Sequence, residues 1–566
     1  MRKLKLPVFA LLESLDFKPR GPQVESGGWH GPLARGPWAT CPSRRPRRAW
    51  FARAVARGRR LDLLAVSLLA GQSLLTADVR LPAVFGDHMV LQQGIPVPIW
   101  GWADEGERVT VEFRGQKVAT RAVNGQWWVK LKPLRAGGPD AMVVRGHNYL
   151  GIQDVLVGEV WVCSGQSNME WPLRASFAAT NDIAQSANPN LRLFSVPKLR
   201  ALVPTNDVRA AWQLSDPNST PGFSAVAYYF GRALERDRRV PVGLIHSSWG
   251  GSPAEVWMSD GFLRGDPEYK KDIVDPYRET RRAYEQNLAQ WEKERAAAAQ
   301  AGQKFEKGRP WEPWRPTELY NGMIAPLIPY ALRGAIWYQG ESNASRARQY
   351  RRLFVEMIAN WRRDWGQGDF TFLAVQLAPW DRGKKRALAE ITASPMESDW
   401  AELREAQNLA TERLPKVGVA VITDVGDKDD IHPAKKEPVG ERLALAARVL
   451  AYRERVHGLS PTCRSVRFQG AKAIVRFNHV GPGLEARGGE LTGFAVAGAD
   501  RVFAWAKAEV VGKDQVAVCS PEVANPVAVR YGWADYPVVN LWSKDGLPAS
   551  PFRTDDFPMV TTPKKP

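Results

Sequence analysis

The feature that most constrains the fold is an apolar run at residues 155–163 that leads into the turn Gly165-Gln166-Ser167-Asn168. Its near-continuous β-branched and aromatic content predicts a strand buried on both faces, as in a parallel sheet covered by helices. The glycine allows a sharp turn at the end of that strand. Because α/β folds bind ligands beyond the carboxyl ends of their strands, Ser167 is expected to face a crevice. The alternative is that Gly-x-Ser is simply a common turn composition.

Hydrophobic patterning divides the rest of the chain. Residues 78–151 alternate around an Asn124-Gly125 turn, which predicts a small antiparallel β domain. In residues 152–455, apolar runs alternate with helical patterns, which predicts a doubly wound α/β sheet. We expect helices there at 228–236, 323–332 and 440–450.

Two further segments have their own patterns. A charged stretch at about 260–317, with aromatic and apolar residues at helical spacing, predicts a helical insertion into the α/β domain. Residues 456–566 contain alternating strands separated by Gly and Pro turns, which predicts a C-terminal β-sandwich.

Residues 1–77 are expected to be a leader. Basic residues at 57–60 precede an apolar run at 63–70 and the small residues Thr76 and Ala77, as in a signal peptide whose start is assigned too far upstream. The run is shorter than the roughly 20 residues that span a bilayer, so we expect a secreted or periplasmic protein with no stable membrane association after cleavage. Most of the net charge of +18 lies in residues 1–60. No basic stripe with aromatics follows, which argues against nucleic acid as a partner.

The four cysteines, Cys41, Cys163, Cys463 and Cys519, lack zinc-site spacing. We expect neither a metal nor a cofactor. Cys463 and Cys519 could pair in an oxidising compartment, and the sequence leaves this question and the oligomeric state open.

A serine nucleophile needs a base, and seven histidines are available. Five of the seven lie in the leader, in the predicted β segments or at their border, so His246 and His432 remain as candidates for the base. His432 follows an apolar run at 417–423, and a carboxylate from Asp429 or Asp430 could accept its Nδ1 proton so that Nε2 faces the serine. Either aspartate is within reach, and an exposed loop histidine is the alternative interpretation.

Attack on an ester also needs hydrogen-bond donors for the developing oxyanion. Candidate donors are the paired glycines Gly250 and Gly251 and the side chain of Asn343, each beyond a predicted strand. The alternative interpretations are that the glycine pair only forms a turn and that Asn343 only caps a helix. The 23 tryptophans suggest a sugar ligand, because indole faces stack on pyranose rings. Trp171, four residues past Ser167, and Trp249, beside the glycine pair, are the candidates to contact the substrate.

These strings together resemble the four blocks of the SGNH hydrolase superfamily and, within it, the sialate O-acetylesterase family: Gly165-Gln166-Ser167-Asn168, Gly250-Gly251, Gly340-Glu341-Ser342-Asn343 and Asp430-Ile431-His432-Pro433. The resemblance extends through residues 78–92, 320–327 and 546–555. It implies that Ser167 is the nucleophile and His432 the base. It also implies an oxyanion hole of the Ser167 N–H, a glycine of the 250–251 pair and Asn343, with Gln339 as a rival donor. Superfamily spacing selects Asp429, whereas the family string selects Asp430.

The resemblance therefore implies a secreted serine esterase that removes O-acetyl groups from sugars, most of all sialate, through an acetyl-serine intermediate. The expected partner is an acetylated sugar or glycan. Alternatives are an acetyl xylan or other glycan acetylesterase, and a non-catalytic carbohydrate-binding protein on an inactive hydrolase scaffold. A lipase or peptidase with the same groups is a third possibility, which the lack of an apolar lid-like helix disfavours.

Overall fold

The structure, a computed structural model, describes residues 78–563, so the predicted leader at 1–77 lies outside the described residues. Its centre is an 11-stranded mixed sheet with the main order β13-β12-β11-β7-β10-β8-β9. Every pairing along this path is parallel except that of β8 with β9. The path consists of β7 (Tyr149–Gly165), β8 (Asn188–Ser195), β9 (Trp212–Ser215), β10 (Val242–Ser248), β11 (Gly334–Tyr338), β12 (Thr371–Val375) and β13 (Val417–Ala420). The predicted α/β class is confirmed.

Strand β7 is buried from Val155 to its end, as predicted from its apolar run. Its alternate residues enter two different hydrophobic clusters. Val160 and Val162 belong to one cluster, and Trp161 and Cys163 belong to the other. Both faces of the strand are therefore covered, which explains why its sequence does not alternate between apolar and polar residues.

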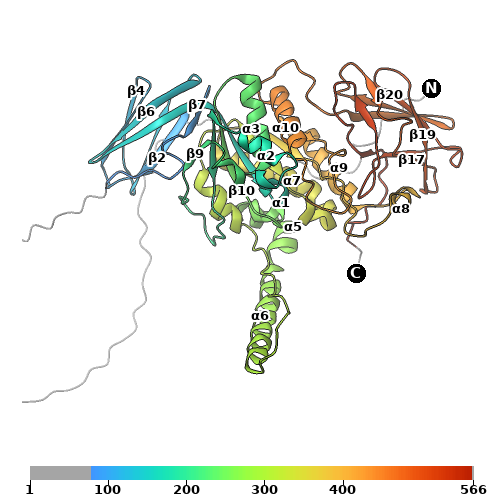
Figure 1. Ribbon diagram of the computed structural model, residues 1–566, viewed down its shortest axis with the longest axis horizontal. Helices are drawn as coiled ribbons and strands as arrows, with labels where there is room; N and C mark the ends of the chain where they lie inside the picture. The colour runs from blue at the N-terminus through green and yellow to red at the C-terminus, as the bar shows by residue number, and fades with distance from the viewer. Residues whose placement is uncertain (1–77, 564–566) are drawn as a thin grey trace, which may run out of the picture. The chain divides into compact units, whose positions relative to one another are not determined.

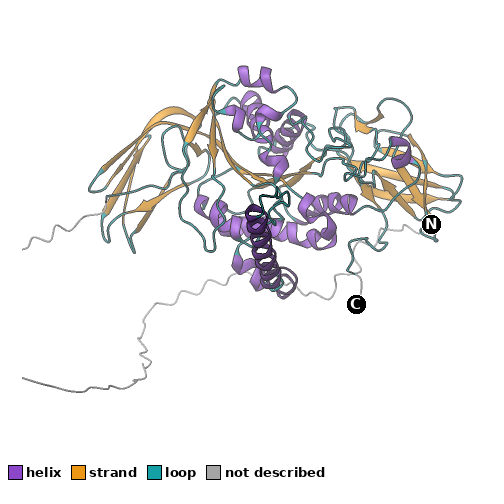
Figure 2. Cartoon of the chain, turned by 60° about the horizontal axis from the view of Figure 1, so that its bottom comes forward, coloured by secondary structure: helices purple, strands orange, loops and turns teal. Residues whose placement is uncertain are grey.

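Helices cover the two faces of the central sheet (Figure 2). On the Cys163 side the core includes residues of α3 (Ala225–Arg238) and α10 (Glu437–Leu450). On the Val162 side it includes residues of α7 (Ala347–Trp365) and α9 (Asp399–Arg413). The predicted helices at 228–236 and 440–450 are confirmed as α3 and α10.

The N-terminal strands continue the same sheet. Strands β6 and β7 pair antiparallel, and β3 joins β4 to β6. Beside them is a separate β2–β5 pair. At the turn before β5, Asn124 and Gly125 have φ values of 54° and 73°, as a two-residue hairpin turn requires. The strands are β1 (Val90–Gln92), β2 (Val97–Trp102), β3 (Arg108–Phe113), β4 (Gln116–Arg121), β5 (Gln126–Leu131) and β6 (Gly137–Arg145).

Helix α6 (Tyr277–Gln300) is the longest helix in the charged stretch predicted to be helical, and Figure 1 shows it projecting from the helices around the sheet. Shorter helices are α1 (Ser167–Glu170), α2 (Ala179–Ala184), α4 (Asp260–Gly265), α5 (Pro267–Tyr269) and α8 (Leu388–Thr392). The predicted helix at 323–332 is wrong. Only short turns occur there, Tyr320–Ile324 and Ala325–Leu327. Pro326 and Pro329 lack the N–H groups that would continue a helix.

The C-terminal region contains two four-stranded antiparallel sheets, β14-β15-β20-β19 and β18-β17-β21-β23, whose residues share one hydrophobic cluster. A β16–β22 pair accompanies them. Cys463 lies opposite Phe477, Cys519 lies opposite Lys472, and both thiols are free. The strands are β14 (Thr462–Gln469), β15 (Lys472–Asn478), β16 (Leu484–Ala486), β17 (Phe494–Ala497), β18 (Phe503–Trp505), β19 (Lys507–Val510), β20 (Gln515–Cys519), β21 (Ala528–Tyr531), β22 (Leu541–Ser543) and β23 (Phe552–Arg553).

None of the helices among the described residues combines the length and apolar character needed to cross a bilayer.

Candidate active site

Ser167 begins helix α1 at the carboxyl end of β7. The turn before it depends on Gly165, which has φ +142° and lies so close to β11 that an added Cβ would be 2.1 Å from the Tyr338 carbonyl oxygen. Only glycine fits that approach. The turn presents a partly exposed Ser167 at the edge where the parallel strands end.

His432 lies in the loop beyond β13, and its Nε2 is 2.8 Å from Ser167 Oγ. The ring of Trp171 stacks on the imidazole with a centroid distance of 5.4 Å and an interplanar angle of 19°. Burial lowers the pKa of His432. The Lys436 cation lowers it further, and Asp430 opposes both effects. A neutral imidazole in this position can accept the serine proton.

The two candidate aspartates lie in different surroundings. Asp430 Oδ1 accepts the backbone N–H of His432 at 2.8 Å and lies 3.7 Å from His432 Nδ1. Asp429 instead pairs with Lys428 at 2.6 Å and is well exposed. Asp430 is therefore the aspartate next to the imidazole, although its distance to Nδ1 is longer than a hydrogen bond.

His246, the other candidate base, does not contact Ser167. It lies on β10 with Nε2 2.6 Å from Ser248 Oγ. Burial lowers the pKa of His246 to about 4. The described residues thus contain a second serine–histidine pair, at the end of the neighbouring strand β10, in which Ser248 is buried and His246 is half-buried.

The predicted glycine donors lie beside the nucleophile. An added Cβ at Gly250 would be 3.3 Å from Ser167 Cβ, and the Gly250 N–H donates to Glu170 Oε2 at 2.6 Å. Gly251 has φ +75°, which suits glycine, and its carbonyl accepts from Trp314 Nε1 at 2.8 Å. Within residues 78–563 no acceptor takes the Ser167 N–H, which leaves it available to a substrate oxygen.

The two candidate amides are fully buried and bind protein groups. Gln339 Nε2 donates to Asn343 Oδ1 at 2.7 Å, and Asn343 Nδ2 donates to Glu255 Oε2 at 3.0 Å. Asn343 Oδ1 also accepts the Ala254 N–H, and Gln339 Oε1 accepts the Tyr350 hydroxyl. In this arrangement both side chains join the loops around the site to one another.

The two candidate sugar-binding tryptophans have different partners. Trp171 supports His432 and donates from Nε1 to the Ala175 carbonyl at 2.9 Å. Trp249 lies beneath Lys198 Nζ, 5.4 Å from the ring centroid. Trp171 therefore packs against the imidazole, whereas Trp249 belongs to the loop that contains Gly250 and Gly251.

A buried polar network behind Ser167 was missed by the sequence analysis. Asn168 Nδ2 donates to Glu341 Oε1 at 2.7 Å and to the Ile431 carbonyl at 3.0 Å, and Lys436 Nζ donates to Asn168 Oδ1 at 2.5 Å. Asn168 thus connects the nucleophile turn to the loop that carries His432. Burial raises the pKa of Glu341 and lowers the pKa of Lys436 to about 7. The sequence offered one clue: Asn168 and Glu341 lie within the motifs that contain Ser167 and Asn343, and Lys436 follows the motif of His432 by a few residues.

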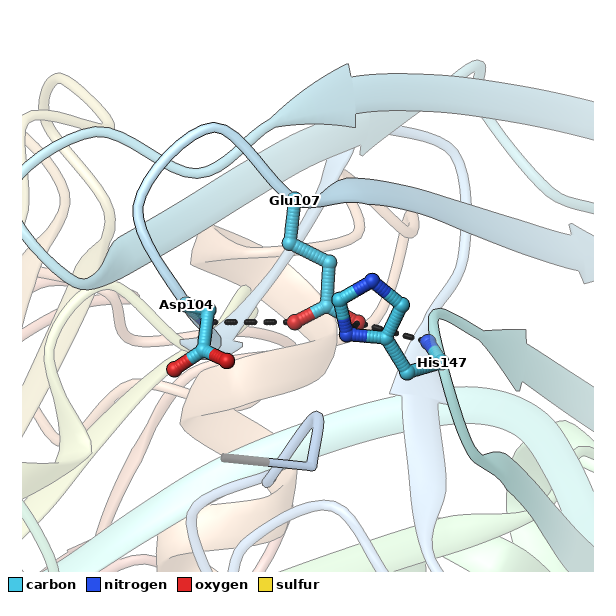
Figure 3. A group of neighbouring side chains, drawn as sticks. All are labelled: Asp104, Glu107 and His147. Carbon is cyan, nitrogen blue, oxygen red and sulfur yellow. Dashed lines mark hydrogen bonds and ion pairs between the residues drawn. The ribbon is translucent and has the colours of Figure 1, made fainter. Parts of the chain in front are cut away.

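Asp104, Glu107 and His147 form a separate group in the N-terminal strands, with ligand-type atoms within 4.8 Å of one another (Figure 3). Glu107 is buried and accepts backbone N–H groups from Asp104 at 3.1 Å and from His147 at 2.6 Å. These bonds join the β2–β3 and β6–β7 turns, so the carboxylate of Glu107 has a structural role.

Comparison with known proteins shows similarity to carbohydrate esterases. The family described as carbohydrate esterase, sialic acid-specific acetylesterase, matches residues 295–448. Sialate O-acetylesterase of Mus musculus is 31% identical over 420 residues, which cover 66% of this chain and 74% of the mouse protein. The Homo sapiens enzyme is 32% identical over 410 residues, covering 66% and 72%.

A solved structure is also similar. The crystal structure of a carbohydrate acetylesterase from Xanthomonas citri is 38% identical and superposes with a TM-score of 0.72, covering 85% of this chain and all of that one. The chain therefore belongs to the sialate O-acetylesterase family of carbohydrate esterases and is a carboxylic ester hydrolase.

Proposed function

We propose that this protein is a secreted or periplasmic serine esterase that removes O-acetyl groups from sugars, with O-acetylated sialic acid as the first candidate substrate. The observation that carries the proposal is the 2.8 Å approach of His432 Nε2 to Ser167 Oγ. It occurs at the carboxyl edge of parallel strands, where α/β folds place catalytic groups. The finer organisation belongs to the same proposal: a signal peptide in residues 1–77, an SGNH-type domain at 152–455, and flanking β domains, the second a β-sandwich.

In the proposed reaction, Ser167 Oγ attacks the acetyl carbonyl carbon while His432 Nε2 takes its proton. The Ser167 N–H supplies one donor to the oxyanion, and the remaining donors stay predicted among Gly250, Gly251, Asn343 and Gln339. His432 then protonates the departing sugar hydroxyl, which leaves an acetyl group on Ser167. Water repeats the sequence and releases acetate. Asp430 is the candidate to stabilise the imidazolium that forms.

Acetylated glycans other than sialosides are a second candidate class. The favouring observation is the likeness to the Xanthomonas citri carbohydrate acetylesterase, which spans all of that chain. A non-catalytic carbohydrate-binding role is disfavoured because the chain belongs to a family of carbohydrate esterases.

Acetate release tests the proposal directly. The purified protein is expected to release acetate from at least one of an O-acetylated sialoside, an acetylated xylo-oligosaccharide and 4-nitrophenyl acetate. Acid quenching during turnover should leave an acetyl group on the peptide that contains Ser167, detectable by mass spectrometry. The absence of acetate release from all three substrates would end the esterase proposal.

The acid limb of the pH profile is expected to depend on Lys436. A proton-accepting His432 must be neutral, so activity falls as pH drops through its pKa. Burial and the Lys436 cation lower that pKa, so the wild-type enzyme stays active to lower pH than an ordinary histidine would allow. Lys436 has a pKa of about 7 and is charged where the acid limb lies. Lys436→Met therefore raises the pKa of His432 and moves the acid limb of kcat/KM to higher pH.

The neighbouring Lys435 provides the matched control. It is exposed and lies over the ring of Phe177. Lys435→Met removes the same charge one residue away and is expected to leave the acid limb in place. An unchanged limb in Lys436→Met, measured between pH 4 and 8, would contradict the assigned electrostatic effect.

A further inference from the structure

A row of three tryptophan rings leads away from Ser167. It begins at Trp249, whose neighbour Gly250 is so close to the serine that an added Cβ would be 3.3 Å from Ser167 Cβ. The ring centroid of Trp314 is 5.4 Å from that of Trp249, and that of Trp311 is 6.4 Å from that of Trp314. We call Trp249, Trp314 and Trp311 the tryptophan row.

The first two rings of the row are held in place. Lys198 Nζ lies 5.4 Å from the centroid of Trp249, and the Arg200 guanidinium lies 4.7 Å from that of Trp314. Trp314 also donates from Nε1 to the carbonyl of Gly251. Such restraint reduces the entropy lost when a ligand binds.

The third ring is open to solvent. The side chain of Trp311 is 73% exposed, and among residues 78–563 the only other exposed tryptophan is Trp128. Trp311 and Trp314 follow α6 within the helical insertion. The insertion therefore places an exposed ring next to Trp314, whose indole N–H is bound to the glycine loop beside Ser167.

The cations that lie over the first two rings are paired with carboxylates. Lys198 forms an ion pair with Glu170, and Arg200 forms ion pairs with Glu312 and Glu318. The row therefore combines indole rings with nearby charged side chains, a mixture that suits a ligand with both apolar ring faces and hydroxyls.

We propose that the tryptophan row binds the sugar units that flank the acetylated one, so that the preferred substrate is an acetylated glycan of at least two pyranose units. This inference rests on the proposed esterase function and adds a subsite to the same active site. A neutral glycan and a sialylated glycan share the pyranose faces that would stack on Trp311.

The test compares Trp311→Ala with the wild-type enzyme on three substrates. Acetylated xylo-oligosaccharide and O-acetylated sialyllactose each contain flanking sugars, whereas 4-nitrophenyl acetate has none. We expect KM to rise about five- to tenfold for at least one glycan, at unchanged kcat, because one aromatic stacking contact is lost. The kinetics on 4-nitrophenyl acetate should not change, and Trp311→Phe should restore most of the glycan affinity. The matched control is Trp128→Ala, which removes the other exposed tryptophan, on β5, and should alter none of these values.

An unchanged KM for both glycans would overturn the subsite and is the result expected if Trp311 instead contacts another protein. An equal loss on all three substrates would also overturn it, because the ring would then support the fold. Failure of the esterase proposal is separate: the wild-type protein would release no acetate from any substrate. In that case calorimetric titration with the two glycans still tests the subsite. Weaker binding by Trp311→Ala than by the wild-type protein would support the subsite, and equal binding would overturn it.

Discussion

Ser167→Ala is expected to lower kcat for acetate release by a factor on the order of 10⁶, as when the nucleophilic serine or its histidine is removed from a serine protease. The reason is geometric: His432 Nε2 has no other hydroxyl at hydrogen-bond distance among the described side chains. His432→Ala should have a comparable effect. Since the two groups act as one unit, the double variant should be little worse than either single variant.

The second serine–histidine pair provides an internal control. Ser248 is buried and bonds to His246 at the end of the adjacent strand. Ser248→Ala removes an equivalent hydroxyl and is expected to keep most of the activity. Initial-rate assays on 4-nitrophenyl acetate suffice. Full activity in Ser167→Ala, or a loss confined to Ser248→Ala, would show that the nucleophile has been misassigned.

Arg404→Met is expected to destabilise the fold by about 3 kcal/mol or more, because buried carbonyls that lose their donors cost about 1 to 3 kcal/mol each. Arg404 lies on α9, is fully buried, and has no ion-pair partner within the part of the chain that the structure describes. Its guanidinium donates to the carbonyls of Leu377, Ala378, Ala534 and Asp535 at 2.7 to 3.2 Å. The bonds join the segment after β12 to the C-terminal region. The substitution also removes a buried cation and with it the cost of keeping that charge away from water. This gain offsets part of the lost stability.

The measurement is the midpoint of thermal unfolding of the whole protein, compared with Arg413→Met. Arg413 lies on the same helix but is exposed. Its replacement should shift the midpoint little, because exposed positions contribute within about 0.5 kcal/mol. Equal midpoints for the two variants would mean that Arg404 does not join these segments.

The pairing of Ser167 with His432 was predictable because both follow apolar runs that form parallel strands. The carboxyl ends of such strands lie at one edge of the sheet, so residues far apart in sequence meet there. The same reasoning placed Gly250 beside the serine. A different inference, that helical spacing of apolar residues predicts a helix, failed at 323–332. Two prolines prevent a helix there.

Buried polar side chains account for most of what the sequence did not reveal. Lys436 and Arg404 are among the residue types most often found at the surface, so their burial follows only from tertiary partners. The amides of Asn343 and Gln339 were predicted as donors toward a substrate, but Asn343 donates to Glu255, which is distant in sequence, and Gln339 donates to Asn343. Sequence pattern identifies such residues as noteworthy and does not say which way they point.

Strand β7 has a consequence for how the protein can be dissected. One uninterrupted backbone serves as the partner of β6 at its start and as the support of Ser167 at its end. A fragment that began at residue 152 would discard the β6 strand that pairs with β7 and leave an unpaired, apolar edge open to aggregation. Expression of the hydrolase portion alone should therefore retain the N-terminal strands, whichever boundary the hydrophobic pattern suggests.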